Sequence, residues 1–145
     1  MKRIVVDTNV LVSFLTDRNA TQQEMATALF EAAARGEVQI VLHQMVISEW
    51  VYVLGNLYHV ETPEIAEMLT DLLSLPGVSP VNEVLWTRLL EIWPDRVSDF
   101  ADAVLAVVTQ EARYDSVATF DQRFIRQLRR EGLTPYWERG EKSVD

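Results

Sequence analysis

Four acidic residues occur where the surrounding sequence is otherwise apolar or small. Asp7 directly follows a β-branched apolar run, and Asp121 follows a second short run of apolar and small residues. Glu49 has apolar neighbours three and four positions away, and Asp102 lies among alanines. Burying an unpaired carboxylate costs several kcal/mol or raises its pKa. These acids therefore need either water or a binding partner.

The four acids come from separate segments, and together they favour a divalent metal site. Carboxylates that meet without a cation repel one another. The chain has no lysine between Arg3 and Lys142, no cysteine and only two isolated histidines. A ligand set made only of oxygen suits magnesium or manganese better than zinc. Such ions can activate water for phosphodiester hydrolysis.

Three of the four acids also have a structural explanation when taken alone, whereas the helix dipole explains Asp102 less well. Asp7 and Asp121 are suited to capping the helices that follow them. Glu49 could lie at the wet margin of its helix. Asp99, three residues before Asp102 on the same helical face, suits the positive end of a helix dipole. His43 and His59 are expected to be ordinary surface or interface residues.

Alternating strands and helices must position these side chains. Short apolar runs predict strands at 4–6, 38–42, 78–81 and 116–119. Helical patterns and end signals predict helices at 10–15, 22–35, 44–57, 62–75, 82–93, 99–113 and 121–131, with Thr62, Asn82 and Ser98 as caps. This alternation predicts an α/β fold with a parallel sheet. The carboxyl ends of parallel strands form sites at one edge, which places Asp7 near Asp121.

Composition predicts one soluble cytoplasmic domain. The chain has 145 residues, 48% of them apolar, which suits a single domain over 1–145 with a tail at 134–145. The absence of cysteine excludes disulfides and thiol catalysis. Neither a signal peptide nor a membrane helix is predicted. The net charge of −9 offers no general basic excess for a polyanion, so nucleic acid would need a local patch.

Four short motifs resemble those of PIN-domain ribonucleases in the same order. The motifs lie at 4–10, 47–50, 100–106 and 117–124, and the resemblance covers about residues 3–125. A chain this short that carries only such a domain looks most like the VapC toxins of toxin–antitoxin pairs. The resemblance implies a PIN-like three-layer α/β/α sandwich around a central parallel sheet.

The resemblance also implies a function. It implies an endoribonuclease that depends on magnesium or manganese and acts on tRNA or rRNA, with a cognate antitoxin and a homodimeric state. By motif position, Asp7, Glu49 and Asp102 match the metal-binding and catalytic acids, and Asp121 matches a fourth, more variable one. Asn9, Asp99 and Thr119 match secondary positions. Products should carry 5′-phosphate and 3′-hydroxyl ends.

Arginines cluster in the last predicted helix. Arg123, Arg126 and Arg130 are spaced by three and four residues and share a face, with Arg129 beside them. They are candidate RNA backbone contacts. The alternatives are a solvated face with cations at the helix C-terminus, or contacts to a carboxylate of the antitoxin.

Other function classes fit less well. Phosphatases of the haloacid-dehalogenase type need a second aspartate where this chain has Asn9, and receiver domains need a late lysine that is missing. A catalytically silent PIN-fold binding or scaffold module remains the alternative. Four mutually repelling acids argue against it, and metal-induced stabilisation would distinguish the two.

Overall fold

A four-stranded parallel sheet forms the centre of the protein. The computed structural model describes residues 1–138. The strands are β1 (Lys2–Val6), β2 (Val38–His43), β3 (Val78–Val81) and β4 (Ser116–Ala118), in the spatial order β3-β2-β1-β4. All three strand pairs are parallel. The predicted α/β class with a central parallel sheet is confirmed.

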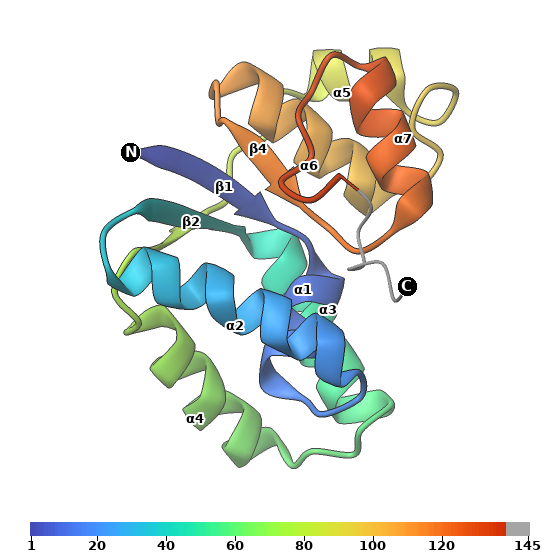
Figure 1. The fold of residues 1–145 in the computed structure, drawn as a ribbon. Coiled ribbons are helices and arrows are strands. Elements are labelled where there is room, and N and C mark those ends of the chain that lie inside the picture. The colour runs from blue at the N-terminus through green and yellow to red at the C-terminus, as the bar shows by residue number, and fades with distance from the viewer. Residues whose placement is uncertain (139–145) are drawn as a thin grey trace.

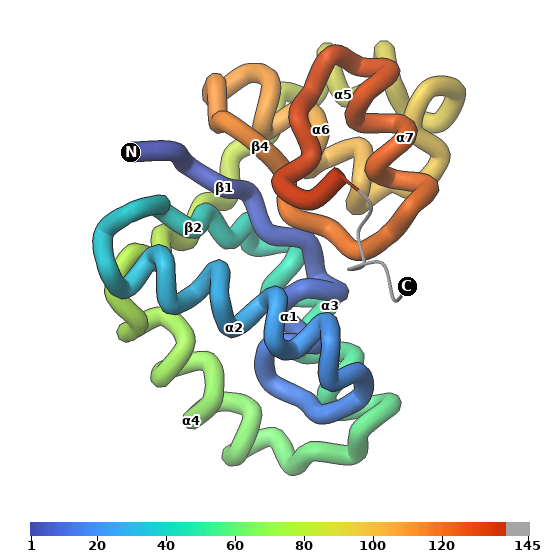
Figure 2. Tube along the Cα trace, in the orientation of Figure 1, coloured from blue at the N-terminus to red at the C-terminus, as the bar shows by residue number. Residues whose placement is uncertain are grey.

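Helices cover both faces of this sheet and complete the three-layer α/β/α sandwich (Figure 1). One face carries α1 (Thr8–Leu15), α2 (Ala20–Ala34), α3 (Gln44–Asn56) and α4 (Thr62–Leu73). The other carries α5 (Trp86–Ile92), α6 (Phe100–Glu111) and α7 (Gln122–Arg130). The same division is visible in the Cα trace of Figure 2. None of the helices within residues 1–138 is long and apolar enough to span a bilayer.

The two inner strands are buried because helices cover both of their faces. Ile4, Val5 and Val6 of β1 are fully buried, as expected for a β-branched run in a parallel sheet. Val6 pairs with Ala118 of β4, so these strands end at the same level. This register brings the residues after β1 and those after β4 to one edge of the sheet.

The segment after β3 differs from the sequence prediction. A helix was expected from 82, but 82–85 has no helical structure and α5 begins only at Trp86. The imidazole of His43 at the end of β2 lies 3.0 Å from the Glu83 carbonyl oxygen. This tertiary contact holds the backbone beside the sheet edge, so Asn82 does not cap a helix.

Two further caps are shifted by one residue. Asp99, not Ser98, caps α6, because its carboxylate accepts a hydrogen bond from the Asp102 backbone N–H at 3.0 Å. Glu61 occupies the cap position of α4 without a side-chain bond, and Thr62 is already helical. Helix ends fray over one or two residues, which is the size of both shifts.

Part of the expected tail is integrated into the fold. The Tyr136 backbone N–H donates to the Val117 carbonyl oxygen at 2.8 Å, and Val117 and Pro135 form an isolated parallel bridge. Trp137 stacks on Phe120, with 4.8 Å between ring centroids. Residues 139–145 of the predicted tail lie outside the described residues.

Gly77 lies in the turn between α4 and β3, where the backbone conformation favours glycine and a side chain would have no room. Its φ is +79°, and a Cβ there would lie 2.7 Å from the Ala33 carbonyl oxygen. Gly36 has a similar φ of +76°, but a Cβ there would meet no atom within 4 Å. We expect Gly77→Ala to lower the free energy of unfolding by about 2–4 kcal/mol and Gly36→Ala by about 1 kcal/mol. Urea unfolding of both variants measures this, and equal losses would show that the contact with Ala33 is easily relieved.

Candidate active site

An acidic pocket lies at the sheet edge where β1 and β4 end. Its volume is about 330 Å³. It is lined by Asp7, Glu49, Asp99, Asp102 and Asp121, together with Thr8, Asn9, Val12, Arg18, Val53, Leu57 and Tyr58. The fold thus brings together all four predicted acids and two of the three secondary residues. Thr119, the third, touches the cluster through Asp7.

Asp7 is the most firmly held of the acids. It is only 6% exposed, and it caps α1 by accepting a hydrogen bond from the Thr8 backbone N–H at 2.7 Å. Its other carboxylate oxygen accepts a hydrogen bond from the Thr119 hydroxyl at 2.8 Å. The Asn9 amide donates to Thr119 at 3.2 Å and accepts from the Phe120 backbone N–H at 3.1 Å. The capping role and the place in the pocket therefore coexist, and they fix the direction of this carboxylate.

Glu49 reaches the pocket from the middle of α3. Its carboxylate accepts a hydrogen bond from the Thr8 hydroxyl at 2.8 Å, which links α3 to the start of α1. The residue is half-buried. It therefore lies at the margin of its helix, as one interpretation of the sequence predicts, and this margin faces the other acids.

The remaining acids lie at the starts of α6 and α7. Asp99 caps α6, and Asp102 follows in its first turn, half-buried. Asp121 caps α7 by accepting hydrogen bonds from the backbone N–H groups of Arg123 and Phe124 at 2.9 and 3.3 Å. Capping therefore directs the carboxylates of Asp99 and Asp121 as well, since backbone N–H groups hold them.

The carboxylates oppose one another's ionisation. Burial, and then the charges of Asp7, Asp99, Asp121 and Glu49, raises the pKa of Asp102 to about 8. Burial also raises the pKa of Asp7 to about 6, although hydrogen bonds from Thr119 and Thr8 partly offset it. At neutral pH the pocket is therefore short of positive charge. A bound cation or protons can supply it.

The donor types fit magnesium or manganese, because the four predicted ligands that meet in the pocket are all carboxylates. Within residues 1–138 no group of three or more acidic or histidine side chains is already arranged to hold an ion. Hydrogen bonds fix the carboxylate of Asp7. When a metal ion binds, we therefore expect the side chains of the half-buried Glu49 and Asp102 to move toward it.

Arg18 is a pocket residue that sequence patterns did not single out. Its guanidinium donates to the Ser13 hydroxyl at 2.8 and 3.0 Å and to the Asn9 carbonyl oxygen at 3.1 Å. Ser13 is fully buried, so this anchor is firm. Arg18 is the one cationic residue that lines the acidic pocket in the part of the chain that the structure describes. It lies in a loop without periodicity, so no sequence signal marks it.

His43 is not the surface or interface residue that the sequence suggested. It is 4% exposed and caps α3, with its Nδ1 accepting from the Met45 backbone N–H at 3.1 Å. Burial lowers its pKa. It does not line the acidic pocket, and its role is to connect β2, α3 and the segment after β3.

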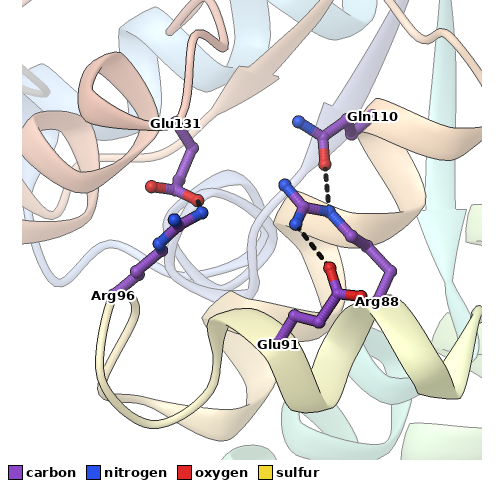
Figure 3. A network of polar contacts seen from close by, with 5 residues as sticks. All are labelled: Arg88, Glu91, Arg96, Gln110 and Glu131. Atoms are coloured by element: carbon purple, nitrogen blue, oxygen red, sulfur yellow. Dashed lines mark hydrogen bonds and ion pairs between the residues drawn. The ribbon is translucent and has the colours of Figure 1, made fainter.

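The predicted arginines line a second hollow beside the first. This hollow has a volume of about 590 Å³ and is lined by Arg123, Arg126, Arg129 and Arg130 of α7, Arg96, Asp95 and Ser98 of the α5–α6 loop, and Gln127. Arg96 was not predicted. It approaches α7 through an ion pair with Glu131 at 3.5 Å, shown in Figure 3.

Comparisons with known proteins agree with this architecture. The model of the PIN domain family matches residues 4–129. The structure resembles the VapC20 toxin of Mycobacterium tuberculosis, which cleaves the sarcin–ricin loop, with 17% identity over 90% of this chain and 96% of that one and a TM-score of 0.62. It also resembles a domain of a protein of unknown function from Methanocaldococcus jannaschii, with 20% identity, coverage of 100% and 97%, and a TM-score of 0.56. No curated protein matches the sequence. Because the family model extends from β1 almost to the end of α7, the chain belongs to the PIN domain family.

Proposed function

We propose that this protein is an endoribonuclease dependent on magnesium or manganese and the toxin component of a toxin–antitoxin pair. The observation that carries the proposal is the convergence of Asp7, Glu49, Asp99, Asp102 and Asp121 on one pocket that is short of positive charge. Membership of the PIN family and the likeness in fold to the VapC20 toxin support it.

Asp7, Glu49 and Asp102 would hold the ion, with Asp121 as a further ligand. An ion bound there would polarise a phosphodiester and lower the pKa of water. These four side chains are both the proposed metal ligands and the proposed catalytic residues. Asp99, Asn9 and Thr119 have secondary roles, because Asn9 and Thr119 orient Asp7 and Asp99 adds negative charge.

Asp7 and Arg18 have distinct roles in this proposal. Asp7 is a rigid anchor, because two hydrogen bonds from Thr8 and Thr119 fix it at the end of β1. Arg18, fixed by Ser13, presents a positive charge on the pocket wall to an incoming phosphate. Without a cation the clustered carboxylates repel RNA phosphates, so substrate binding should follow cation binding.

The partners follow from the family resemblance. We propose structured RNA, either tRNA or rRNA, as substrate, and the likeness in fold to VapC20, a toxin that cleaves the sarcin–ricin loop, supports a structured target. The cognate antitoxin, the homodimer, the cytoplasmic location and the single domain over residues 1–145 stay predictions.

Mapping of RNA ends tests the proposal. Purified protein incubated with total cellular RNA and Mg²⁺ or Mn²⁺ is expected to create new 5′-phosphate and 3′-hydroxyl ends at a few structured sites, and EDTA is expected to abolish them. Sequencing of 5′-phosphate ends detects them. If neither ion yields new ends and neither raises the melting temperature, the silent binding module is the better description.

A further inference from the structure

We propose that the hollow beside the acidic pocket, which we call the arginine groove, binds the phosphate backbone of the RNA strand next to the cleaved bond. The groove consists of Arg96, Arg123, Arg126, Arg129 and Arg130 with Asp95, Ser98 and Gln127. The inference rests on the proposed function, and it adds where the substrate lies and which residues hold it.

The charge distribution is the first argument. The chain carries a net charge of −9 and has 13 lysine and arginine residues, yet five of these 13 line the arginine groove. Among residues 1–138, Asp95 is the only acidic residue that lines it, so the described lining has a net charge of +4. A positive groove on an acidic protein attracts a polyanion locally, while the rest of the surface repels it.

A solvated helix face with cations at its C-terminus does not explain this cluster. The helix dipole favours Arg129 and Arg130, which lie in the last turn of α7. It disfavours Arg123, which lies in the first turn, where the helix end is positive. Arg96 comes from a different segment altogether. Two sequence-distant segments therefore place cations around one hollow.

Within residues 1–138, much of the donor capacity in the arginine groove has no partner. Arg96 is paired with Glu131 at 3.5 Å, as Figure 3 shows, and Arg129 donates to the Glu138 carbonyl oxygen at 2.7 Å. Arg123, Arg126 and Arg130 make no side-chain ion pair within residues 1–138. Free guanidinium groups bind phosphate through paired, charge-assisted hydrogen bonds.

The arginine groove adjoins the acidic pocket at two places. Ser98 lines the groove and Asp99 lines the pocket, and Asp121 lines the pocket and Arg123 the groove. Arg123 to Arg130 covers about 10 Å along the axis of α7, which exceeds the rise of about 3.4 Å per nucleotide in one strand. A strand that leaves the pocket at this border therefore meets a series of cations suited to successive phosphates.

Binding measurements test this without relying on catalysis. In the Asp102→Asn background with Mg²⁺, the probe is a fluorescein-labelled 20-nucleotide single-stranded RNA of mixed sequence, and its anisotropy reports binding. We expect Arg126→Gln/Arg130→Gln to weaken binding about tenfold at 100 mM salt and to reduce the slope of log K against log salt by about 1.4, or 0.7 per phosphate contact. Arg123→Gln alone should reduce the slope by about 0.7.

The matched control is Lys2→Gln/Arg35→Gln, which removes the same charge from two exposed positions. Both lie near the amino ends of β1 and β2, whereas the acidic pocket lies where strands end. It should change the salt slope by less than half as much. Equal effects of both double variants would overturn the proposal. So would a groove variant that keeps RNA affinity but loses binding to the cognate antitoxin, because the groove would then be a protein contact.

Failure of this inference is separable from failure of the proposed function. If the wild-type protein cleaves RNA and the groove variants show an unchanged KM, the arginine groove is not the substrate site although the nuclease stands. If the wild-type protein cleaves no RNA but the groove variants lose affinity as expected, the groove inference stands and the proposed catalysis fails.

Discussion

Asp102→Asn is expected to lower RNA cleavage by about 10²–10⁴-fold while making the metal-free protein more stable at pH 8. The loss follows because Asp102 is a proposed metal ligand, and metal-assisted stabilisation of the transition state is worth several kcal/mol. The gain follows because burial and four neighbouring carboxylates raise the pKa of Asp102 to about 8. Asparagine has nearly the same shape and no charge to be repelled.

The opposite signs of the two effects make the test specific. A substitution that merely damaged the fold would lower cleavage and melting temperature together. Asp71→Asn, the same change at an exposed position of α4, serves as the control and should leave both within about twofold and about 1 °C of wild type. Cleavage is measured as the initial rate of 5′-phosphate end formation, and stability by thermal unfolding in EDTA. An Asp102→Asn protein that keeps a tenth of its activity would remove Asp102 from the catalytic machinery.

The acidic pocket is stabilised by the same groups that begin three helices. Asp7, Asp99 and Asp121 cap α1, α6 and α7, so backbone N–H groups hold these carboxylates. The positive ends of these helix dipoles therefore offset part of the repulsion among the acids. Asp102 and Glu49 have no cap position, and Asp102 shows a larger rise in pKa than Asp7.

The sequence was sufficient to predict the four strands and to predict which acids lie in one pocket. A β-branched run followed by a polar residue marks the end of a buried parallel strand, and the residues after each strand gather at the carboxyl edge of such a sheet. Asp7 and Asp121 were therefore placed together by topology alone. Glu49 and Asp102 were found because a charge among apolar or small residues conflicts with burial, which is a local signal.

The features that could not be predicted depend on contacts between distant segments. The non-helical segment at 82–85 results from the contact between His43 and Glu83, which are 40 residues apart. The place of Arg18 depends on the buried hydroxyl of Ser13, and that of Arg96 on its ion pair with Glu131. Arg18 and Arg96 lie outside the helices, so no helical periodicity assigns either of them to a site. Only the fold shows which hollow each of them lines.

The stability of the metal-free protein is expected to fall as pH rises from 5 to 8.5. In the folded state the pKa of Asp7 is raised from 3.8 to about 6 and that of Asp102 from 3.8 to about 8. The folded protein therefore holds protons that the unfolded chain releases. The contribution of these two groups is fully present below pH 4 and is lost as pH rises through about 6 and then about 8.

A shift of one pKa unit corresponds to at most about 1.4 kcal/mol of unfolding free energy. Asp102 is only half-buried and water screens its charge, so the two shifts contribute less than this maximum. We therefore expect the free energy of unfolding to fall by about 2–4 kcal/mol between pH 5 and pH 8.5. Urea unfolding in EDTA at pH 5, 6.5, 7.5 and 8.5 measures the slope. The Asp102→Asn variant should lose most of the slope above pH 6.5, because only Asp7 then titrates in the folded state with a raised pKa.

Divalent metal should offset much of this loss of stability at high pH. An ion binds the ionised carboxylates only, so its stabilising effect grows as they lose their protons. At a concentration one hundred times the Kd, Mn²⁺ would stabilise the protein by about 2.7 kcal/mol at pH 8, and by much less at pH 5, where protons compete for the same oxygens. The difference between the two pH values should vanish in Asp102→Asn. If the stability of the metal-free protein instead rises between pH 5 and 8.5, the carboxylates do not repel one another in the folded state. The acidic pocket would then not support the proposed function.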